Sequence, residues 1–343
     1  MTSTVDPARL LGLIDEIAGR RVVIAGDLLA DQFIYGEIAR VSREAPVLIL
    51  NYDSTEVVPG GAGNAAANVA ALGGSARAMG QTGRDEAGRR LLGALRQRKV
   101  DVAQVIRPAH FRTPTKTRIL AGGIHSAKQQ VVRIDHASGA ADEKTRAAFE
   151  SRVLRAVRGA DALLVSDYGC GLVTPDLAAR ARQVFRAKAH APVVVDSRYK
   201  LLEFHGMTAC TPNESEVEQA LGVKIGDDRK ALERAGRALL RRTRAKAVLV
   251  TRGSRGMALF EPARPTVHIP IVGSDQIADV TGAGDTVIAT LTLALSAGAT
   301  FLEAAHLANH AGGLVVMKRG TATVSASELR YAISGGAIGR PSR

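Results

Sequence analysis

Short apolar runs with the length of buried strands alternate with helix-forming stretches along most of this chain. Runs at 22–25, 162–166 and 247–251 consist mostly of Val, Ala, Leu and Ile, and helical patterns separate them. This alternation predicts a mostly parallel sheet covered by helices on both faces. Polar residues follow the strands directly or nearly so, namely Asp27, Asp167, Asp196, Asn213 and Thr251. Because ligands bind at the carboxyl ends of parallel strands, the sequence predicts one shared cleft there.

Two segments, about 32–58 and 112–135, interrupt this alternation. They contain strand-like runs at 33–35, 47–50, 115–120 and 129–135, with few helix signals. We interpret these runs as a small separate sheet inserted over the cleft, a lid that excludes water from a reactive site. The whole chain, 1–343, is then one domain with the lid inserted in its core. Lys116 and Arg118 would share a face of their strand, where they could meet a substrate phosphate or water.

The charge balance favours an anionic small molecule as the ligand. The 343 residues include 46 Lys and Arg against 33 Asp and Glu, a net charge of +13. The basic residues are not interleaved with aromatic ones, so nucleic-acid binding is a minor alternative. Two cysteines make no disulfide framework, and the sequence shows neither a signal peptide nor an apolar run of membrane-spanning length. We therefore expect a cytoplasmic protein with no membrane partner.

The stretch from Asp279 to Thr286 reads DVTGAGDT and precedes the apolar run 287–295. A glycine turn before a long buried helix leaves backbone N–H groups at the helix end, where the helix dipole favours an anion such as a phosphoryl group. Asp285 would lie in the same turn and could act as a general base. The alternative is an ordinary acid in a first helical turn, which complements the dipole without catalysis.

A second glycine turn, Gly60 to Asn64, precedes an alanine-rich helical stretch. Gly61, Gly63 and Ala66 fit a dinucleotide fingerprint, so a dehydrogenase is an alternative, although the turn does not closely follow the first core strand. The bare glycine backbone could instead let a polyol lie close, with Asn64 bonded to a hydroxyl. A tight turn before a helix explains the same residues without a ligand.

Two other polar groups also have two interpretations each. Asn213 and Glu216 have the spacing of a capping box, and they could also orient the waters of a bound Mg²⁺ near nucleotide phosphates. Asp27 and Asp31 flank the exit of the first strand. Their carboxylates could clamp vicinal hydroxyls or could simply be solvated.

Together these motifs resemble those of the ribokinase-like (PfkB) carbohydrate kinases. The stretch 279–286 is similar to the C-terminal signature of that family, and Gly60, Gly61 and Asn64 are similar to the N-terminal one. The segment 211–216 (TPNESE), together with Thr251, Gly253 and Gly256, also matches, and the resemblance covers about 21–324. It implies a three-layer α/β/α sandwich with a mainly parallel central sheet and a small inserted β-sheet lid.

Within the family, the chain most resembles the D-glycero-D-manno-heptose 7-phosphate kinases of lipopolysaccharide core synthesis. The matching stretches are 26–31 (GDLLAD), 42–47 (SREAPV), 166–169 (SDYG) and 318–321 (KRGT). That subgroup often has Lys after SDYG, where this chain has Cys170. Some members carry a fused nucleotidyltransferase domain, whereas this chain would be a stand-alone kinase.

The resemblance implies transfer of the ATP γ-phosphoryl group to the anomeric hydroxyl, which gives a heptose 1,7-bisphosphate. Asp285 would take the proton, and the backbone N–H groups of Gly282, Ala283 and Gly284 would hold the phosphoryl group. ATP and Mg²⁺ are the implied cofactors, and family members often use a monovalent cation such as K⁺. The implied binding residues are Asn213 and Glu216 for the metal, Asn213, Thr251, Gly253, Gly256 and Asn309 for the nucleotide, Asp31, Gly61 and Asn64 for the sugar, and Lys116 and Arg133 for the 7-phosphate.

Besides nucleic-acid binding, two alternatives stay open at this point. The substrate could be another sugar or sugar phosphate, as in a ribokinase, fructokinase or phosphofructokinase. The protein could also be a non-catalytic sensor of a sugar or nucleotide, although an intact Asp285 argues against that. Exposed lid strands could pair edge to edge, so we expect a homodimer formed through the lid sheet.

Overall fold

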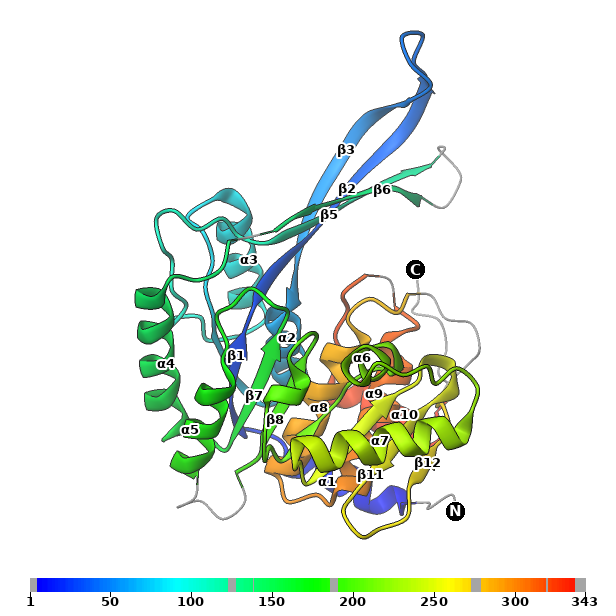
Figure 1. The fold of residues 1–343 in the computed structure, drawn as a ribbon. Helices are drawn as coiled ribbons and strands as arrows, with labels where there is room; N and C mark the ends of the chain where they lie inside the picture. Colours follow the sequence, from blue (N-terminus) through cyan, green and yellow to red (C-terminus); the bar gives the residue numbers. More distant parts are fainter. Residues whose placement is uncertain are drawn as a thin grey trace.

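The structure is a computed structural model that describes residues 5–122, 128–137, 139–185, 191–272, 279–318 and 320–336. Part of the predicted lid, 123–127, and Arg319 of the stretch 318–321 lie outside the described residues. Figure 1 shows a layered body with a second, smaller sheet that projects from one end of it.

An eight-stranded sheet forms the centre of the body. Its order is β12-β11-β10-β9-β8-β7-β1-β4. All neighbours from β4 to β10 run parallel, whereas β11 and β12 are antiparallel additions at one edge. The bounds are β1 (Arg21–Gly26), β4 (Ser75–Met79), β7 (Ala162–Asp167), β8 (Val193–Ser197), β9 (Ala209–Cys210), β10 (Ala247–Thr251), β11 (Met257–Phe260) and β12 (Val267–Ile269). The predicted mainly parallel sheet is confirmed.

Helices cover both faces of this sheet, because successive residues of each strand point to opposite sides. Val22 and Ile24 of β1 belong to one buried apolar cluster, and Val23 and Ala25 belong to the other. The first cluster is covered by α1 (Pro7–Glu16), α2 (Ala62–Ala71), α3 (Glu86–Gln97), α8 (Ala283–Ser296), α9 (Phe301–Val315) and α10 (Ala326–Ile333). The second is covered by α4 (Glu143–Val157), α5 (Pro175–Phe185), α6 (Glu214–Leu221) and α7 (Arg229–Thr243). Within the described residues, no helix is both long and apolar enough to cross a membrane.

The lid is a four-stranded sheet in the order β3-β2-β5-β6. Its strands are β2 (Leu28–Val41), β3 (Leu48–Gly61), β5 (Thr115–Gly122) and β6 (Gln129–His136). All four predicted lid strands are present, but β2 and β3 are longer than predicted. They form a long hairpin that reaches away from the body (Figure 1).

The root of the lid lies inside the core. β2 begins two residues after β1 ends, and β3 runs directly into α2 at Gly61. The glycine turn at 60–61 is therefore the end of a lid strand as well as the start of a helix. This continuity places the inner face of the lid over the carboxyl ends of the central strands.

Candidate active site

Asp285 is buried at the start of α8, on the turn that the sequence identified. The helix follows Gly282, whose φ of +78° is a left-handed conformation that favours glycine. A Cβ at this position would lie 2.4 Å from Asn64 Nδ2, so a side chain there would also collide with a neighbour. The Ala283 N–H donates to Val280 O at 3.2 Å. The predicted role of Ala283 in holding a phosphoryl group would require that turn bond to open.

Both carboxylate oxygens of Asp285 are held by side chains from other elements. Asn64 Nδ2, on α2, donates to Oδ2 at 2.9 Å, and the Tyr168 hydroxyl donates to Oδ1 at 3.1 Å. Burial raises the pKa of Asp285 to about 6, although these two hydrogen bonds lower it. A carboxylate with that pKa is ionised at neutral pH and is basic enough to accept a proton.

Asn64 is itself oriented by Asn68, one helical turn further along α2. Asn68 Nδ2 donates to Asn64 O at 3.1 Å and to Asn64 Oδ1 at 3.3 Å. Thr286 Oγ1 donates to Asn68 Oδ1 at 3.1 Å, so the pair is joined to α8 a second time. Asn64 Nδ2 is consequently the part of its amide that faces Asp285.

Asp31 lies near Asp285 but already has a partner. Its Oδ1 forms a 2.6 Å ion pair with Arg118 of β5, and both side chains are largely buried. A Cβ at Gly60 would lie 2.4 Å from Asp31 Oδ2, so glycine makes room for this carboxylate. Gly61 has φ +57°, and its Cβ would meet Asp27 O at 2.7 Å. The two predicted glycines therefore shape the turn around acids at the root of the lid.

A cavity of about 760 Å³ lies between the lid and the loops beside Asp285. Its cationic groups are Arg98, Arg118 and Lys128, and its carboxylates are Glu56 and Asp279. The remaining lining residues are Phe33, Tyr35, Val58, Leu120, Gln130, Thr281, Gly320 and Thr321. The cavity is large enough for a sugar phosphate, and its cations suit an anionic group.

The two residues predicted to meet the substrate phosphate differ in their surroundings. Lys116 Nζ lies 5.2 Å from the centroid of the Tyr168 ring, and burial lowers the pKa of this lysine. Arg133 is paired with Asp135 two residues along the same strand, at 2.6 Å. Arg118, which is opposite Arg133 across the lid strands, reaches the cavity instead.

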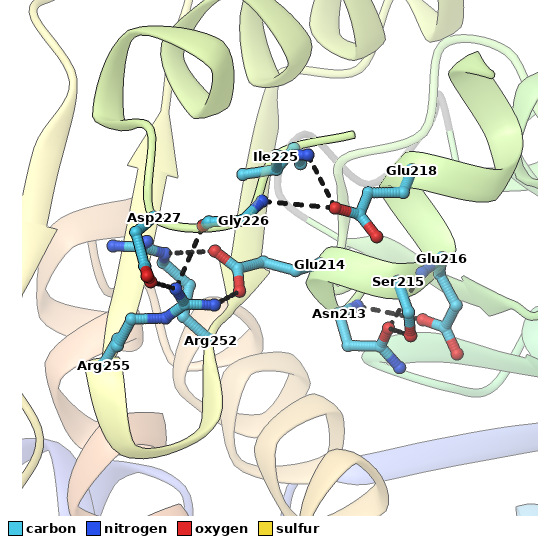
Figure 2. Close-up of polar contacts among 10 residues, drawn as sticks. All are labelled: Asn213, Glu214, Ser215, Glu216, Glu218, Ile225, Gly226, Asp227, Arg252 and Arg255. Atoms are coloured by element: carbon cyan, nitrogen blue, oxygen red, sulfur yellow. Dashed lines mark hydrogen bonds and ion pairs between the residues drawn. The ribbon is translucent and has the colours of Figure 1, made fainter. Parts of the chain in front are cut away.

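Asn213 and Glu216 form the capping box at the start of α6. Asn213 Oδ1 accepts from the Glu216 N–H at 2.9 Å and from Ser215 Oγ at 2.6 Å, and Glu216 Oε2 accepts from the Asn213 N–H (Figure 2). Glu216 Oε1 lies 4.0 Å from Arg198. Burial, Glu216 and Asp285 raise the pKa of Asp196, so Glu216 and Asp285 both lie within electrostatic reach of Asp196.

Glu214 joins α6 to the turn that the sequence assigned to the nucleotide. Its carboxylate pairs with Arg252 at 2.6 Å and with Arg255 (Figure 2). The Thr251 N–H donates to Pro212 O at 2.9 Å, which fixes the end of β10 against the same region.

The two predicted glycines of this turn have left-handed backbones. Gly253 has φ +56° and Gly256 has φ +76°, and a Cβ at Gly256 would lie 2.1 Å from Ile269 O. Asn309 lies on α9 and donates to Pro270 O at 2.7 Å, directly after β12. Asn213, Thr251, Gly253 and Gly256 are thus brought together, whereas Asn309 supports the segment next to them.

Three residues of the site were not predicted to have a role, namely Asn68, Tyr168 and Arg198. Arg118 was predicted to face either a substrate phosphate or water. Tyr168 could have been found from its position directly after Asp167, an acid at the end of a strand. Asn68 could have been found from its i, i+4 spacing to Asn64 on the predicted helix. Arg118 lies opposite Phe33 in the register of β2 and β5 and reaches Asp31 diagonally, a contact for which the sequence has no signal.

Comparison with known proteins identifies the family of this chain. Residues 21–328 match the family described as pfkB family carbohydrate kinase. The bifunctional protein HldE of Caulobacter vibrioides is 40% identical over 94% of this chain and 65% of its own length. That of Erwinia tasmaniensis is 42% identical over 91% of this chain and 63% of its own length. The chain therefore spans less than two thirds of these relatives.

Two solved structures share the fold at low identity. Arabidopsis thaliana ribokinase complexed with ribose and ATP has a TM-score of 0.70 at 20% identity and covers 92% of this chain and 99% of its own. Phosphofructokinase-2 from Escherichia coli in complex with potassium has a TM-score of 0.75 with the same identity and coverage. The predicted ribokinase-like fold is confirmed, and the matches together show that this chain belongs to the pfkB family of carbohydrate kinases.

Proposed function

We propose that this protein transfers the γ-phosphoryl group of ATP to the anomeric hydroxyl of D-glycero-β-D-manno-heptose 7-phosphate, as a step towards ADP-heptose and the lipopolysaccharide core. The observation that carries the reaction type is the Asp285 carboxylate. It is buried, has a pKa near 6 and is held by two donors. Thr281, four residues before it, lines a cavity whose walls include the cations Arg118 and Lys128. The need for ATP supports the expectation that the enzyme works in the cytoplasm.

In this reaction Asp285 removes the proton from O1 of the sugar. The sugar oxygen then forms a bond to the γ-phosphorus, the bond between that phosphorus and the β–γ bridging oxygen breaks, and ADP leaves. Backbone N–H groups of Gly282 and Gly284 at the start of α8 would stabilise the charge on the equatorial oxygens. A positioned base of this kind is worth about 10²–10⁴-fold in rate.

The metal and nucleotide assignments rest on the other half of the cleft. Among the described residues, no group of three or more His, Cys, Asp or Glu side chains is placed to hold a metal ion. Mg²⁺ keeps several waters, so Glu216 Oε1 and the Asn213 amide fit an outer shell. When bound, Mg²⁺ neutralises phosphate charge. Thr251, Gly253 and Gly256 would border the nucleotide, with Asn309 behind them, and a monovalent cation such as K⁺ would assist near the anion site.

Two observations support the heptose substrate. The motifs at 26–31, 42–47 and 166–169 resemble those of heptose 7-phosphate kinases, and the relatives that share about 40% identity are HldE proteins. Arg118 and Lys128 line the cavity and pair with Asp31 and Asp53, and with Lys116 close by they would bind the 7-phosphate in exchange for these pairs. Asp31, Gly61 and Asn64 would contact sugar hydroxyls. Arg133 would act in phosphate binding only after release from Asp135.

The direct test measures ADP release over a panel that contains heptose 7-phosphate, fructose 6-phosphate, ribose and fructose. We expect the highest kcat/KM with heptose 7-phosphate and a product phosphorylated at both ends. Turnover of only ribose, fructose or fructose 6-phosphate would reject the heptose assignment and favour another sugar kinase. Saturable sugar binding with no ADP release from any compound would favour the sensor.

The lid also supports the proposal of a homodimer. β6 is an edge strand, and Val131, Val132 and Ile134 on it are 39%, 47% and 44% exposed. Exposed apolar edge strands favour pairing with another chain. We expect light scattering to give the mass of two chains, and Val132→Lys to give the mass of one. A wild-type monomer at micromolar concentration would contradict the dimer.

A further inference from the structure

The loop that follows β7 is held by two buried carboxylates. Asp27 Oδ2 accepts from the Tyr168 N–H at 2.8 Å and from the Cys170 N–H at 3.1 Å. Asp167 Oδ1 accepts from the Gly169 N–H at 3.0 Å, and its Oδ2 accepts from Ser197 Oγ at 2.7 Å. Burying a carboxylate is costly, and burial raises the pKa of Asp27 to about 6. Asp27 and Asp167 together thus hold the backbone N–H groups of Tyr168 and of the two residues that follow it.

The side chain held in this way ends on the proposed base. The Tyr168 hydroxyl and Asn64 Nδ2 each occupy one oxygen of Asp285, so rotation of the carboxylate would break both bonds. Each ionised oxygen has two acceptor positions, which leaves one on each oxygen for a substrate hydroxyl. Burial and the neighbouring Asp285 raise the pKa of Tyr168, which therefore stays a protonated donor throughout the working pH range.

Two cations lie over the Tyr168 ring, and they come from different parts of the molecule. Lys116 Nζ is 5.2 Å from the ring centroid and belongs to the lid strand β5. Arg198 Cζ is 4.6 Å from the centroid and follows β8, where it also approaches Glu216. Cations within about 6 Å of an aromatic ring attract it. The ring therefore connects the base to the lid and to the nucleotide half of the cleft.

We propose that Tyr168 is a positioning residue, whose hydroxyl aligns Asp285 for proton removal and whose ring makes that alignment depend on Lys116 of the lid and on Arg198. This inference rests on the proposed kinase activity and deepens it. It assigns to the segment 166–169 a task in catalysis that is separate from substrate contact.

Tyr168→Phe keeps the ring and removes only the hydroxyl. We expect kcat to fall about 10–100-fold, by analogy with the loss that follows removal of a hydrogen-bonding partner that orients a metal ligand. The KM values for ATP and for the sugar phosphate should change less than about 2-fold, because the hydroxyl donates to Asp285 and the proposal gives it no role in substrate binding. Tyr331→Phe is the matched control, since Tyr331 is 61% exposed on α10, and its kcat should equal that of the wild type.

The acidic limb of the pH profile separates positioning from a merely structural role. The Tyr168 hydroxyl and Asn64 lower the pKa of Asp285, Lys116 also lowers it, and Asp31 raises it; Asp196 is another acid close to Asp285. Removal of the hydroxyl takes away one of the interactions that lower the pKa of Asp285, whereas burial and the two acids continue to raise it. The acidic limb of kcat should therefore move to higher pH in Tyr168→Phe and stay in place in Tyr331→Phe.

A titration of the free protein keeps this test independent of the substrate assignment. The ¹³C carboxyl resonance of Asp285, identified by its loss in Asp285→Asn, should titrate at higher pH in Tyr168→Phe than in the wild type. If no sugar phosphate is turned over but this shift is seen, the proposed function fails and the positioning contact stands. An unshifted titration, or a kcat within 2-fold of the wild type, would overturn the role of Tyr168.

Tyr168→Leu tests the ring contact. It removes the hydroxyl and the ring together, so Lys116 and Arg198 both lose their aromatic partner. We expect a further loss of kcat beyond that of Tyr168→Phe, together with a higher KM for the sugar phosphate. Equal kinetics for the Phe and Leu variants, with equal thermal stability, would show that the alignment of Asp285 does not depend on the contacts of the ring with Lys116 and Arg198.

Discussion

The two halves of the cleft are constructed in different ways. On the sugar side, Asp285 is held by Asn64 and Tyr168, which are 221 and 117 positions away in the sequence, and the contacts are buried or nearly so. On the nucleotide side, the main contacts are a capping box within 213–216 and a group of arginine ion pairs to Glu214 (Figure 2). The first half depends on the packing of three elements, whereas the second combines a local capping box with ion pairs that join α6 to the turn after β10, 38 and 41 positions away in the sequence. We therefore expect substitutions on the sugar side to lower turnover and substitutions on the nucleotide side to weaken nucleotide binding.

The largest effect should come from Asp285→Asn. The amide is nearly isosteric, but it cannot accept the proton, so turnover should fall by about 10²–10⁴-fold. The melting temperature should stay at or above that of the wild type, because an ionised carboxylate no longer has to be buried. Steady-state kinetics and thermal unfolding check this prediction. A variant with wild-type turnover would remove Asp285 as the base.

Gly282→Ala should affect both folding and turnover. Alanine in a left-handed conformation costs about 1–2 kcal/mol, and its Cβ would displace Asn64 from Asp285. We expect a lower melting temperature and a kcat reduced at least tenfold, as for a misplaced catalytic group. Gly93→Ala is the control, because a Cβ at Gly93 on α3 meets nothing within 4 Å. Equal behaviour of the two variants would show that the turn tolerates a side chain.

The pH dependence of turnover should follow the ionisation of Asp285. Its pKa of about 6 means that the base is ionised at pH 7 and mostly protonated at pH 5. We expect kcat to fall about tenfold between those two values, since only the ionised form accepts a proton. A kcat that is flat down to pH 4.5 would contradict a raised pKa at the base.

The same raised pKa has the opposite effect on stability. The folded state binds this proton more tightly than the unfolded chain, whose carboxyl titrates near 3.8. The contribution of Asp285 to stability is therefore largest below the unfolded value and is lost as the pH rises through about 6. Urea unfolding should be measured for the wild type and for Asp285→Asn at pH 4.5 and 7. The free energy of unfolding of the wild type should contain a decrease from pH 4.5 to 7 that is missing in Asp285→Asn.

The smallest effect should come from Glu214→Gln on the nucleotide side. Loss of the ion pairs to Arg252 and Arg255 should loosen the turn at 253–256 and raise the KM for ATP a few-fold, with little change in kcat. Asp227→Asn is the matched control, because Asp227 also pairs with Arg255 but is 98% exposed. Exposed pairs of this type contribute about 0–1 kcal/mol, so the control should behave as the wild type. Equal ATP affinity in both variants and the wild type would remove Glu214 from nucleotide binding.

Much of the fold was predictable because its signals are local. Strand composition, helix caps and glycine turns identified the parallel sheet, the four lid strands and the start of α8. The sequence did not show that β2 begins at Leu28, because a strand can pass from one sheet to the next without a turn residue.

The site residues likewise differ in whether their contacts are local in the sequence. Asn213 and Glu216 were predictable as a capping box because a capping box is a contact within four residues. Arg133 and Arg118 could not be told apart, because both are cations on lid strands and only the register decides which one meets a carboxylate across the sheet. Arg118 meets Asp31 on β2, whereas Arg133 is paired with Asp135 on its own strand.

The sequence by itself determined the parallel core, the glycine turn before α8, the presence of an acid in that turn and the membership of the carbohydrate kinase family. These features depend on contacts within a few residues or on motifs that survive as linear strings. Only the tertiary structure decided which groups would hold that acid. Asn64 and Tyr168 reach Asp285 because the packing of α2, β7 and α8 brings distant segments within hydrogen-bond distance, and the pKa of Asp285 rises because the same packing removes water from it.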